Sequence, residues 1–157
     1  MSVEALLGLG SNLGNRKALI DDAVWRLGGL PGTRLRARSS YYQTVPVGPV
    51  KQEWFLNIAV ALATDMSQSD LLTACHAIET TLGRDRSREI FWGPRPIDID
   101  LIAYAEWFRF DERAFVLIPL AEIAPLFRAD GQTLAEHAAR VGIEGVEKLD
   151  WSIPHGR

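Results

Sequence analysis

Two aspartates in the second half of the chain have the spacing of a metal-binding pair. Asp98 and Asp100 flank a single isoleucine inside the apolar run 97–104. Side chains of a strand alternate between its faces, so both carboxylates are predicted to point one way and the apolar residues the other. A divalent cation relieves the repulsion between two such carboxylates, and oxygen ligands favour Mg²⁺, which commonly shares the phosphate oxygens of a substrate. The alternative is a polar strand face exposed to solvent.

Positive charge is concentrated just before this pair. Arginine occurs four times in one stretch of twelve residues, at Arg84, Arg86, Arg88 and Arg95. A guanidinium forms forked hydrogen bonds with phosphate oxygens, and phosphoryl transfer depends mainly on positioning and neutralising such oxygens. Arginines beside paired carboxylates therefore indicate a phosphate-transfer site. The alternative is a solvated basic loop whose charges pair with Glu79 and Asp85.

Other residues carry weaker signals. Asn57 is an amide within an apolar strand, and a buried Asn must find hydrogen-bond partners, which the edge of a heterocycle could supply. The segment 8–12 is rich in Gly and Asn but matches neither the Walker spacing nor the dinucleotide fingerprint, so a phosphate loop and a tight strand-to-helix turn both stay open. Cys75 is predicted to be a core residue on a helix. Aromatic residues are expected mostly in the core: Tyr41, Tyr42, Trp54, Phe55 and Trp92.

The elements that must position these residues follow the order β-α-β-β-α-β, with additions. Apolar runs between Pro and Gly breaks predict the strands, and apolar residues at helical spacing predict the helices. This order predicts an α+β fold with a ferredoxin-like core, in which helices pack on one face of an antiparallel sheet. Expected are strands 3–9, 33–44, 54–63 and 97–104, helices 18–27, 67–82 and 133–141, a short apolar element 115–120 and an edge strand 146–149.

The composition is that of one ordinary globular domain over residues 1–157. The chain is 47% hydrophobic and 24% charged, and its apolar runs are too short for a membrane span. One cysteine excludes an internal disulfide and, with a start that lacks a basic leader, predicts a cytoplasmic protein. A net charge of −3 argues against non-specific binding to nucleic acid. We expect small-molecule substrates, no nucleic-acid or membrane partner, and a monomer.

Several motifs, in their order along the chain, resemble those of the 6-hydroxymethyl-7,8-dihydropterin pyrophosphokinase family. One of them is Trp-Gly-Pro-Arg-x-Ile-Asp-Ile-Asp, at 92–100. The matching segments are 7–14, 39–49, 55–57, 78–79, 82–86, 92–100 and 113–125. Enzymes of this family transfer the β,γ-pyrophosphate of ATP to the hydroxymethyl group of a reduced pterin. The resemblance implies the same activity here, as a step of folate biosynthesis, with ATP as co-substrate and two Mg²⁺ ions.

The resemblance also implies roles for individual residues. Four are implied in catalysis: Asp98 and Asp100, which would also bind both metal ions, with Arg84 and Arg95. The implied nucleotide-binding set is Glu79, Arg84, Arg86, Trp92, Arg95 and Arg113. The implied pterin-binding set is Thr44, Val45, Val47, Phe55, Asn57, Trp92 and Phe115. Within it, the pterin ring would stack between Phe55 and Phe115, with Asn57 at its polar edge.

One segment departs from the family pattern. Between Asp100 and Arg113 the chain is shorter, and the missing part normally contributes a strand with adenine contacts and a phosphate-binding histidine. Residues 104–110 must therefore turn back almost at once, with Trp107 and Phe108 as candidates to stack on the base. One alternative is a relative that keeps the pterin pocket but has lost or altered nucleotide use. Another is an interaction module of similar topology, such as a single-stranded RNA binder, which the acidic balance and the aspartate pair oppose.

Overall fold

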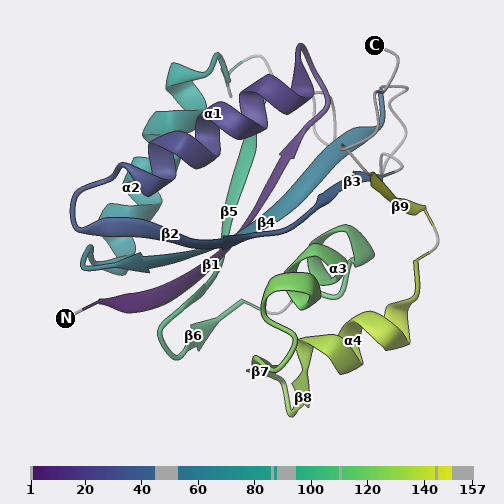
Figure 1. Ribbon diagram of the computed structural model, residues 1–157. Helices are drawn as coiled ribbons and strands as arrows, with labels where there is room; N and C mark the ends of the chain where they lie inside the picture. The colour runs from purple at the N-terminus through teal and green to yellow at the C-terminus, as the bar shows by residue number, and fades with distance from the viewer. Residues whose placement is uncertain are drawn as a thin grey trace.

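A computed structural model describes residues 2–44, 53–85, 87, 95–109, 111–143 and 145–149. Its described residues form a seven-stranded sheet between two layers of helices, beside a small hairpin (Figure 1). The elements are β1 (Val3–Ser11), α1 (Arg16–Gly28), β2 (Thr33–Arg38), β3 (Tyr41–Thr44), β4 (Phe55–Thr64), α2 (Gln68–Thr81), β5 (Asp98–Tyr104), β6 (Trp107–Phe108), α3 (Ala114–Ile123), β7 (Arg128–Ala129), β8 (Gln132–Thr133), α4 (Leu134–Val141) and β9 (Val146–Leu149).

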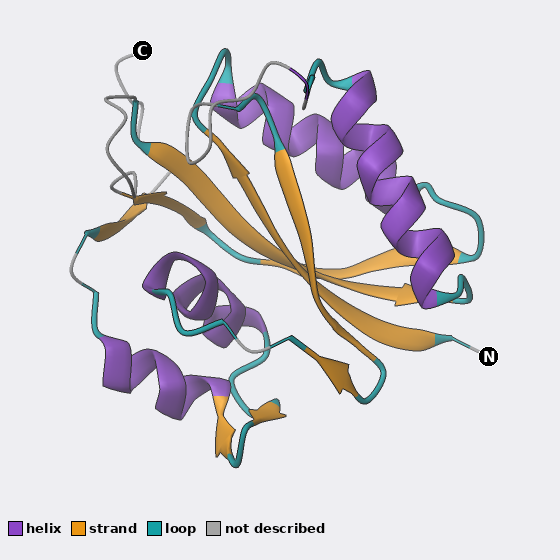
Figure 2. Ribbon diagram, turned by 180° about the vertical axis from the view of Figure 1, so that it is seen from behind, coloured by secondary structure: helices purple, strands orange, loops and turns teal. Residues whose placement is uncertain are grey.

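The sheet is antiparallel throughout its described pairings. Its order is β6-β5-β1-β4-β3-β9, and β2 pairs with the part of β4 that β3 does not reach. Figures 1 and 2 show α1 and α2 on one face and α3 and α4 on the other. The predicted α+β fold is confirmed. Its expected helix layer consists of α1 and α2, whereas α3 and α4 add a layer on the opposite face that the sequence pattern did not indicate.

Alternation of side chains along the strands gives the sheet two apolar faces. Under α1 and α2 lie Leu7, Leu9, Ile20, Leu27, Leu56, Ile58, Leu62, Leu71 and Ile99. Burying one such side chain stabilises the fold by about 1.5–3 kcal/mol. Under α3 and α4 lie Leu6, Ala59, Ala61, Ile102, Val116, Leu117, Leu120 and Leu134. The alanines of β4 on this second face leave room for α3 to pack directly on the sheet.

Two predicted helices start where their capping residues indicate. Ser67 precedes α2, and its Oγ accepts a hydrogen bond from the backbone N–H of Asp70 at 3.1 Å. Thr133 and Glu136 form a capping box at the start of α4. Both helices are therefore confirmed, and Leu72 of α2 is exposed.

The predicted strand 33–44 is two strands, β2 and β3, separated at Ser39 and Ser40. The Ser39 Oγ accepts a hydrogen bond from the backbone N–H of Ala59 at 2.8 Å, and the Ser40 N–H donates to the Glu122 carboxylate at 2.8 Å rather than to β4. Serine side chains compete in this way with backbone ladders. The prediction of one continuous strand is therefore wrong, because side-chain hydrogen bonds break the ladder at this point.

The apolar element 115–120 is part of helix α3. A run this short cannot be assigned to helix or strand by periodicity alone. The helix packs on β4 on one side and on α4 on the other, which explains why its residues are apolar nearly all round. It also contains Pro119, which lacks a backbone N–H and obscured the helix in the sequence.

Candidate active site

The aspartate pair lies on the face of β5 that the sequence predicts. Ile99 and Leu101 are buried in the core under α1 and α2, so Asp98 and Asp100 point to the face covered by α3. Burial and the neighbouring Asp98 carboxylate raise the pKa of Asp100 to about 7, and Arg109 opposes this shift. Two oxygen ligands whose charges repel suit a hard divalent cation such as Mg²⁺. Within the described residues, no three or more His, Cys, Asp or Glu side chains gather as a metal cluster.

A strip without side chains separates the aspartates from β4. On β1, Gly8 is paired with Asp100 and Gly10 with Asp98, and Gly10 is paired on its other side with Asn57. Directly paired residues of antiparallel strands share a face. Asp98 and Asn57 therefore lie on the same face, two strand spacings or about 10 Å apart. Only glycine lies between them.

These glycines correct the interpretation of segment 8–12. The predicted strand 3–9 includes Gly8 and leaves Gly10 in the loop or turn that follows, but β1 continues through Ser11. A Cβ added at Gly8 would meet nothing within 4 Å, whereas one added at Gly10 would lie 2.6 Å from Asn57 Oδ1. A side chain at position 10 would clash with the Asn57 amide, so glycine is required there. Because Gly8 and Gly10 have no side chains, none projects from these positions of β1 between the aspartates and β4.

Asn57 finds its hydrogen-bond partner within the protein. Its Nδ2 donates to Thr44 Oγ1 at 2.6 Å, and both residues are buried. Phe55 is paired with Thr44 and lies on the same face of β4 as Asn57. This bond fixes the amide orientation, because the hydroxyl holds the NH₂ group and leaves the oxygen toward Gly10. The structure thus brings together Thr44, Phe55 and Asn57 of the predicted pterin-binding set.

Arg84 and Glu79 form a buried ion pair next to Asp98. Arg84 Nη1 donates to Glu79 Oε2 at 2.8 Å and to Asp98 Oδ1 at 2.9 Å. Glu79 Oε2 also accepts the backbone N–H of Ile99 at 2.8 Å. The pairing of Arg84 with Glu79 that belonged to the solvated-loop alternative is present, but the side chains are only 3% and 2% exposed. Arg84 therefore neutralises and orients Asp98 from within the protein.

Arg95 lies on the other side of the same carboxylate. Its Nη1 is 3.8 Å from Asp98 Oδ2, and its Nε is buried without a hydrogen-bond partner among the described residues. An unpaired buried donor is costly, about 1–3 kcal/mol. A phosphate oxygen bound beside Asp98 would supply the acceptor that this N–H lacks. This is the observation in the structure that most directly supports a phosphate at this position.

Asn12 holds Arg95 and the start of β4 in place, which sequence reasoning missed. Its Oδ1 accepts the backbone N–H of Arg95 at 3.0 Å, and its Nδ2 donates to the carbonyl of Glu53 at 3.0 Å. Arg16 of α1 donates to the next carbonyl, that of Trp54, at 2.6 Å. Trp54 itself is 41% exposed, so its expected place in the core is wrong. A buried Asn directly after a strand was the available signal for this role.

Arg113 and Phe115 lie together at the start of α3. The Arg113 guanidinium is 4.6 Å from the centre of the Phe115 ring, and it forms a forked ion pair with Asp111, with Nη2–Oδ2 at 2.6 Å. Burial acts against ionisation of Asp111, but hydrogen bonds from Arg113 hold its pKa below the ordinary value. Asp111 therefore orients Arg113, a role that no motif in the sequence indicated.

The predicted early reversal after Tyr104 is confirmed. Ala105 adopts a left-handed turn conformation with φ of 50°, and β6 pairs back on β5. Phe108 contacts Phe127, with ring centres 5.8 Å apart, and joins the second core. Trp107 is 42% exposed. Of the two candidates for stacking on a base, Phe108 is thus engaged in packing and Trp107 is accessible.

Four predicted site residues lie outside the described residues: Val45, Val47, Arg86 and Trp92.

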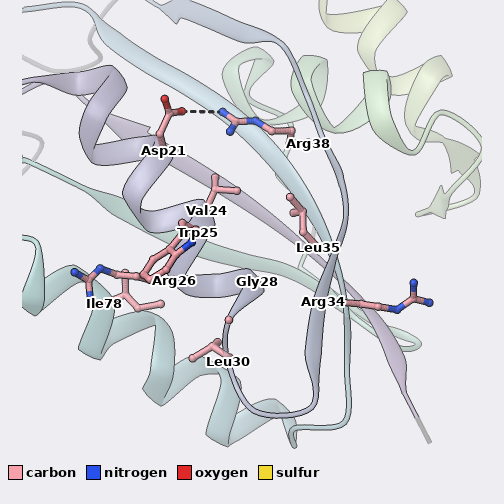
Figure 3. A pocket seen from close by; sticks show the side chains of 11 residues that line it. Asp21, Val24, Trp25, Arg26, Gly28, Leu30, Arg34, Leu35, Arg38 and Ile78 are labelled. Carbon is pink, nitrogen blue, oxygen red and sulfur yellow. Dashed lines mark hydrogen bonds and ion pairs between the residues drawn. The ribbon is translucent and has the colours of Figure 1, made fainter.

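A hollow of about 940 Å³ lies apart from the site, between α1 and β2 on the opposite face of the sheet (Figure 3). Trp25 and Leu35 line it, and Asp21 is paired with Arg38 beside them. None of the predicted site residues is among its lining.

None of the helices in the described part of the chain has the length and apolarity that a membrane crossing requires.

The fold is antiparallel α+β, and an aspartate pair between arginines is chemically suited to a metal ion and phosphate groups. Comparison with known proteins identifies the family. The family model described as 7,8-dihydro-6-hydroxymethylpterin-pyrophosphokinase (HPPK) matches residues 6–125. The chain belongs to this family.

Two relatives carry the name 2-amino-4-hydroxy-6-hydroxymethyldihydropteridine pyrophosphokinase. One, from Methylorubrum extorquens, is 45% identical over 157 residues, covering 93% of this chain and 98% of the relative. The other, from Pseudomonas aeruginosa, is 39% identical over 155 residues, covering 91% and 94%. A match of this extent to relatives of nearly equal length agrees with the family assignment.

Solved structures of the family share the fold. A wild-type Plasmodium falciparum HPPK-DHPS structure with pterin and p-hydroxybenzoate gives a TM-score of 0.69 at 13% identity. An HPPK-DHPS structure in complex with substrates gives a TM-score of 0.70 at 12% identity. The matches cover 94% and 92% of this chain but only 46% and 44% of those longer chains. At such identities the comparison shows the fold alone.

Proposed function

We propose that this chain transfers pyrophosphate from ATP to the hydroxymethyl group of 6-hydroxymethyl-7,8-dihydropterin, in folate biosynthesis. The observation that carries the proposal is the row Asp98–Gly10–Asn57, which places a carboxylate pair and a fixed amide on one face, separated only by glycine. A flat heterocycle above Gly10 would meet the amide on one side and present its substituent to the aspartates on the other.

In this reaction the hydroxymethyl oxygen forms a bond to the β-phosphorus of ATP. The bond between that phosphorus and the oxygen bridging to the α-phosphorus breaks, AMP leaves, and the hydroxyl proton is released. Attacking oxygen, phosphorus and leaving oxygen must be nearly in line, so catalysis rests on positioning and on charge neutralisation.

Asp98 and Asp100 would hold Mg²⁺, two ions by the family resemblance. The metal supplies neutralisation of the phosphate charge. The chemistry of the donor set fits, since the pair offers oxygen ligands only, and burial together with the neighbouring Asp98 carboxylate raises the pKa of Asp100. Arg84 fixes the orientation of Asp98 through its 2.9 Å contact.

Phosphate oxygens would be bound by arginines on both sides of this pair. Arg95 offers its unpaired Nε, and Asn12 fixes the backbone from which it extends. Arg113 offers the part of its guanidinium that Asp111 does not occupy, and it is 38% exposed. Arg86 completes this proposed set. The guanidinium group of each arginine is planar and presents its N–H donors in a fixed fork, which matches the oxygens of a phosphate better than a flexible ammonium group does.

The pterin would lie over Gly10, with its edge on Asn57 and its faces toward Phe55 and Phe115. Asn57 is held by Thr44, so little orientational freedom is lost on binding. Phe115 belongs to α3, which packs over β4, while Phe55 belongs to β4 itself. Stacking between two aromatic rings contributes about 0.5–1.5 kcal/mol per pair beyond the area buried.

The test is formation of AMP from ATP. Purified protein is incubated with ATP, Mg²⁺ and 6-hydroxymethyl-7,8-dihydropterin, and AMP is measured with each component omitted in turn. We expect AMP only when all three are present. Pterin binding without AMP formation would favour a pterin-binding relative with altered nucleotide use, which the early turn at Ala105 makes the second candidate. Absence of both would contradict the proposal.

A further inference from the structure

Strand β3 is tied to a carboxylate on each face of the sheet. Its two consecutive tyrosines point to opposite faces, as neighbouring residues of a strand must. Tyr41 donates to Asp21 of α1, and Tyr42 donates to Glu122 of α3 at 2.5 Å. The first tie lies on the face away from the proposed site, and the second lies on the face that carries it.

Glu122 collects more polar contacts than its place near the end of a helix requires. Its Oε2 accepts the backbone N–H of Ser40 at 2.8 Å and the Ser40 hydroxyl at 3.1 Å. Its Oε1 accepts from Tyr42, and Lys148 Nζ of β9 lies 3.9 Å away. Burial acts against the charge, but the hydrogen bonds from Tyr42 and Ser40 hold the pKa of Glu122 below its ordinary value. The carboxylate is therefore ionised at neutral pH, and its hydrogen bonds are charge-assisted.

The same side of α3 carries Glu122 and Phe115. Seven residues make two helical turns, so these side chains share a face of the helix and are about 10 Å apart along its axis. On β3, Tyr42 and Thr44 likewise share a face and are about 7 Å apart along the strand. A bond between Glu122 and Tyr42 therefore fixes where Phe115 lies along the strand that presents Thr44.

Apolar packing alone does not fix that position. Helix α3 packs mainly on β4, whose residues on this face include Ala59 and Ala61. Larger side chains of the same core, Leu6 and Ile102, lie on the strands β1 and β5 beyond it. Hydrophobic burial has no direction, and a row of alanines offers few ridges against which a helix could lock. The hydrogen bonds of Glu122 are directional and set the register of the helix on the strand.

We propose that Glu122 is a positioning residue for the pterin: it fastens α3 to β3 and so fixes the Phe115 ring relative to Thr44 and Asn57. The proposal rests on the proposed function, in which those residues bind the pterin. It assigns to Glu122 no contact with either substrate. Its effect is expected mainly on pterin binding, because the nucleotide side of the site is built mostly on β5 and the arginines before it, and only Arg113 of its described residues lies at the start of α3.

The chain offers a closely matched control in Glu136 of α4. Its Oε1 also accepts a backbone N–H and a hydroxyl, both from Thr133, at 2.9 and 3.0 Å. Removing this carboxylate deletes the same kinds of hydrogen bond in the same helical layer. It does not touch the contact between α3 and β3. Glu136→Ala therefore separates a general loss of stability from a loss of position.

The experiment compares wild type, Glu122→Ala, Glu122→Gln, Tyr42→Phe and Glu136→Ala. Dissociation constants for the pterin and for a non-hydrolysable ATP analogue with Mg²⁺ are measured by titration, and Tm by thermal unfolding. For Glu122→Ala we expect pterin binding weakened about tenfold, a difference of about 1.4 kcal/mol. Nucleotide binding should change less than about twofold. Glu122→Gln and Tyr42→Phe should show smaller losses in the same direction, and Glu136→Ala should lower only Tm.

Three results would overturn the proposal. One is unchanged pterin affinity in Glu122→Ala. Another is an equal loss for pterin and nucleotide, which would indicate general damage. If Glu122→Ala does not fold, unchanged pterin affinity in both Glu122→Gln and Tyr42→Phe decides against it. Failure of the proposed function is recognised separately, because wild type itself would then neither bind the pterin nor form AMP, and the positioning role would fall with it.

Discussion

The side chains around Asp98 bring carboxylates close together with arginines beside them, and Arg109 and Arg113 also interact electrostatically with the aspartate pair. Two carboxylates and the buried Glu79 lie beside two arginines, Arg84 and Arg95. Burial, and after it the neighbouring Asp98 carboxylate, disfavour the charged form of Asp100 and raise its pKa to about 7. Such a shift is expected where a ligand of opposite charge completes the site.

The two aspartates should therefore respond differently to neutral substitution. Asp98→Asn and Asp100→Asn should each lower the transfer rate by about a thousandfold or more, because a metal ligand is lost. Asp100→Asn should keep or raise Tm, since it removes a repelling charge, whereas Asp98→Asn should lower Tm by leaving Arg84 without one of its partners. Steady-state rates and thermal unfolding of both variants test this. Activity within about tenfold of wild type in both would exclude the metal-ligand assignment.

Gly10 and Gly8 provide a second residue-scale test. In Gly10→Ala the new methyl would lie 2.6 Å from Asn57 Oδ1, so the amide must move from its bond with Thr44. We expect weaker pterin binding and a loss of about 1–3 kcal/mol in the free energy of unfolding, as for other overpacked sites. Gly8→Ala is the control, because its methyl meets nothing within 4 Å. Urea unfolding should show no loss of stability for Gly8→Ala; equal destabilisation of both variants would count against the close-approach argument.

At the scale of elements, β3 is a short strand whose position depends on side chains from both helix layers. It pairs with β4 on one side and β9 on the other, and its tyrosines reach Asp21 and Glu122. Arg38 Nη2 and Lys17 Nζ also contact Asp21, at 3.1 and 2.8 Å. A strand this short forms few backbone hydrogen bonds, so the side-chain hydrogen bonds help to fix its position in the sheet.

The Asp21 tie makes part of the stability depend on pH. Burial acts against ionisation of Asp21, but hydrogen bonds from Lys17, Tyr41 and Arg38 lower its pKa below the ordinary 3.8. A lowered folded-state pKa contributes stability that is present above pH 3.8 and lost as the pH falls through the folded-state pKa. We expect Asp21→Asn to lower the free energy of unfolding at pH 7, with a difference from wild type that shrinks below about pH 4.

Asp22→Asn is the matched control for this measurement. Asp22 is the next residue on α1, and it has one half-exposed i,i+4 pair, with Arg26, at side-chain exposures of 42% and 38%. Exposed pairs contribute about 0–1 kcal/mol. Urea unfolding at pH 7, 5 and 3 compares the variants. A constant difference between wild type and Asp21→Asn at all three values would contradict the assigned tie.

At the scale of the whole molecule, one sheet joins the two ends of the described chain. β1 lies at its centre, and β9 pairs with β3 at its edge. This supports our proposal that residues 1–157 form a single pyrophosphokinase-like domain. In the proposed arrangement the site lies between the sheet and α3, so both parts must be in place for Phe55 and Phe115 to stack on one ligand.

The short connection from β5 to α3 should affect nucleotide selectivity. β6 turns back at Ala105, and Phe108 is engaged with Phe127, so within residues 95–109 few groups are left to form hydrogen bonds with the edge of a base. We expect ATP to be preferred over GTP by less than about tenfold, or about 1.4 kcal/mol. Transfer rates with each nucleotide at saturating pterin measure this.

Trp107 provides the control for this prediction. It is the accessible aromatic of the hairpin, so Trp107→Ala should weaken ATP but not pterin if its ring stacks on the base. Strong selectivity for ATP that is unchanged in Trp107→Ala would show that the base binds elsewhere.

The sequence by itself determined the features that depend on local spacing. The period-two pattern placed Asp98 and Asp100 on one face of β5, and apolar residues at helical spacing, after a serine able to cap them, indicated α2. Alternation and capping are properties of a few consecutive residues, so they can be read without knowledge of the fold. The family motifs then supplied the pterin, which spacing alone could not.

Only the tertiary structure decided the contacts between residues distant in sequence. It showed Gly10 opposite Asn57, Asn12 bound to Arg95, and Glu122 bound to Tyr42. It also turned segment 115–120 into a helix over the second face, because burial between the sheet and α4 outweighs the weak local signal of a short apolar run with an internal proline. Each of these depends on sheet register and layer packing, which follow from the free energy of the whole chain and not from any one segment.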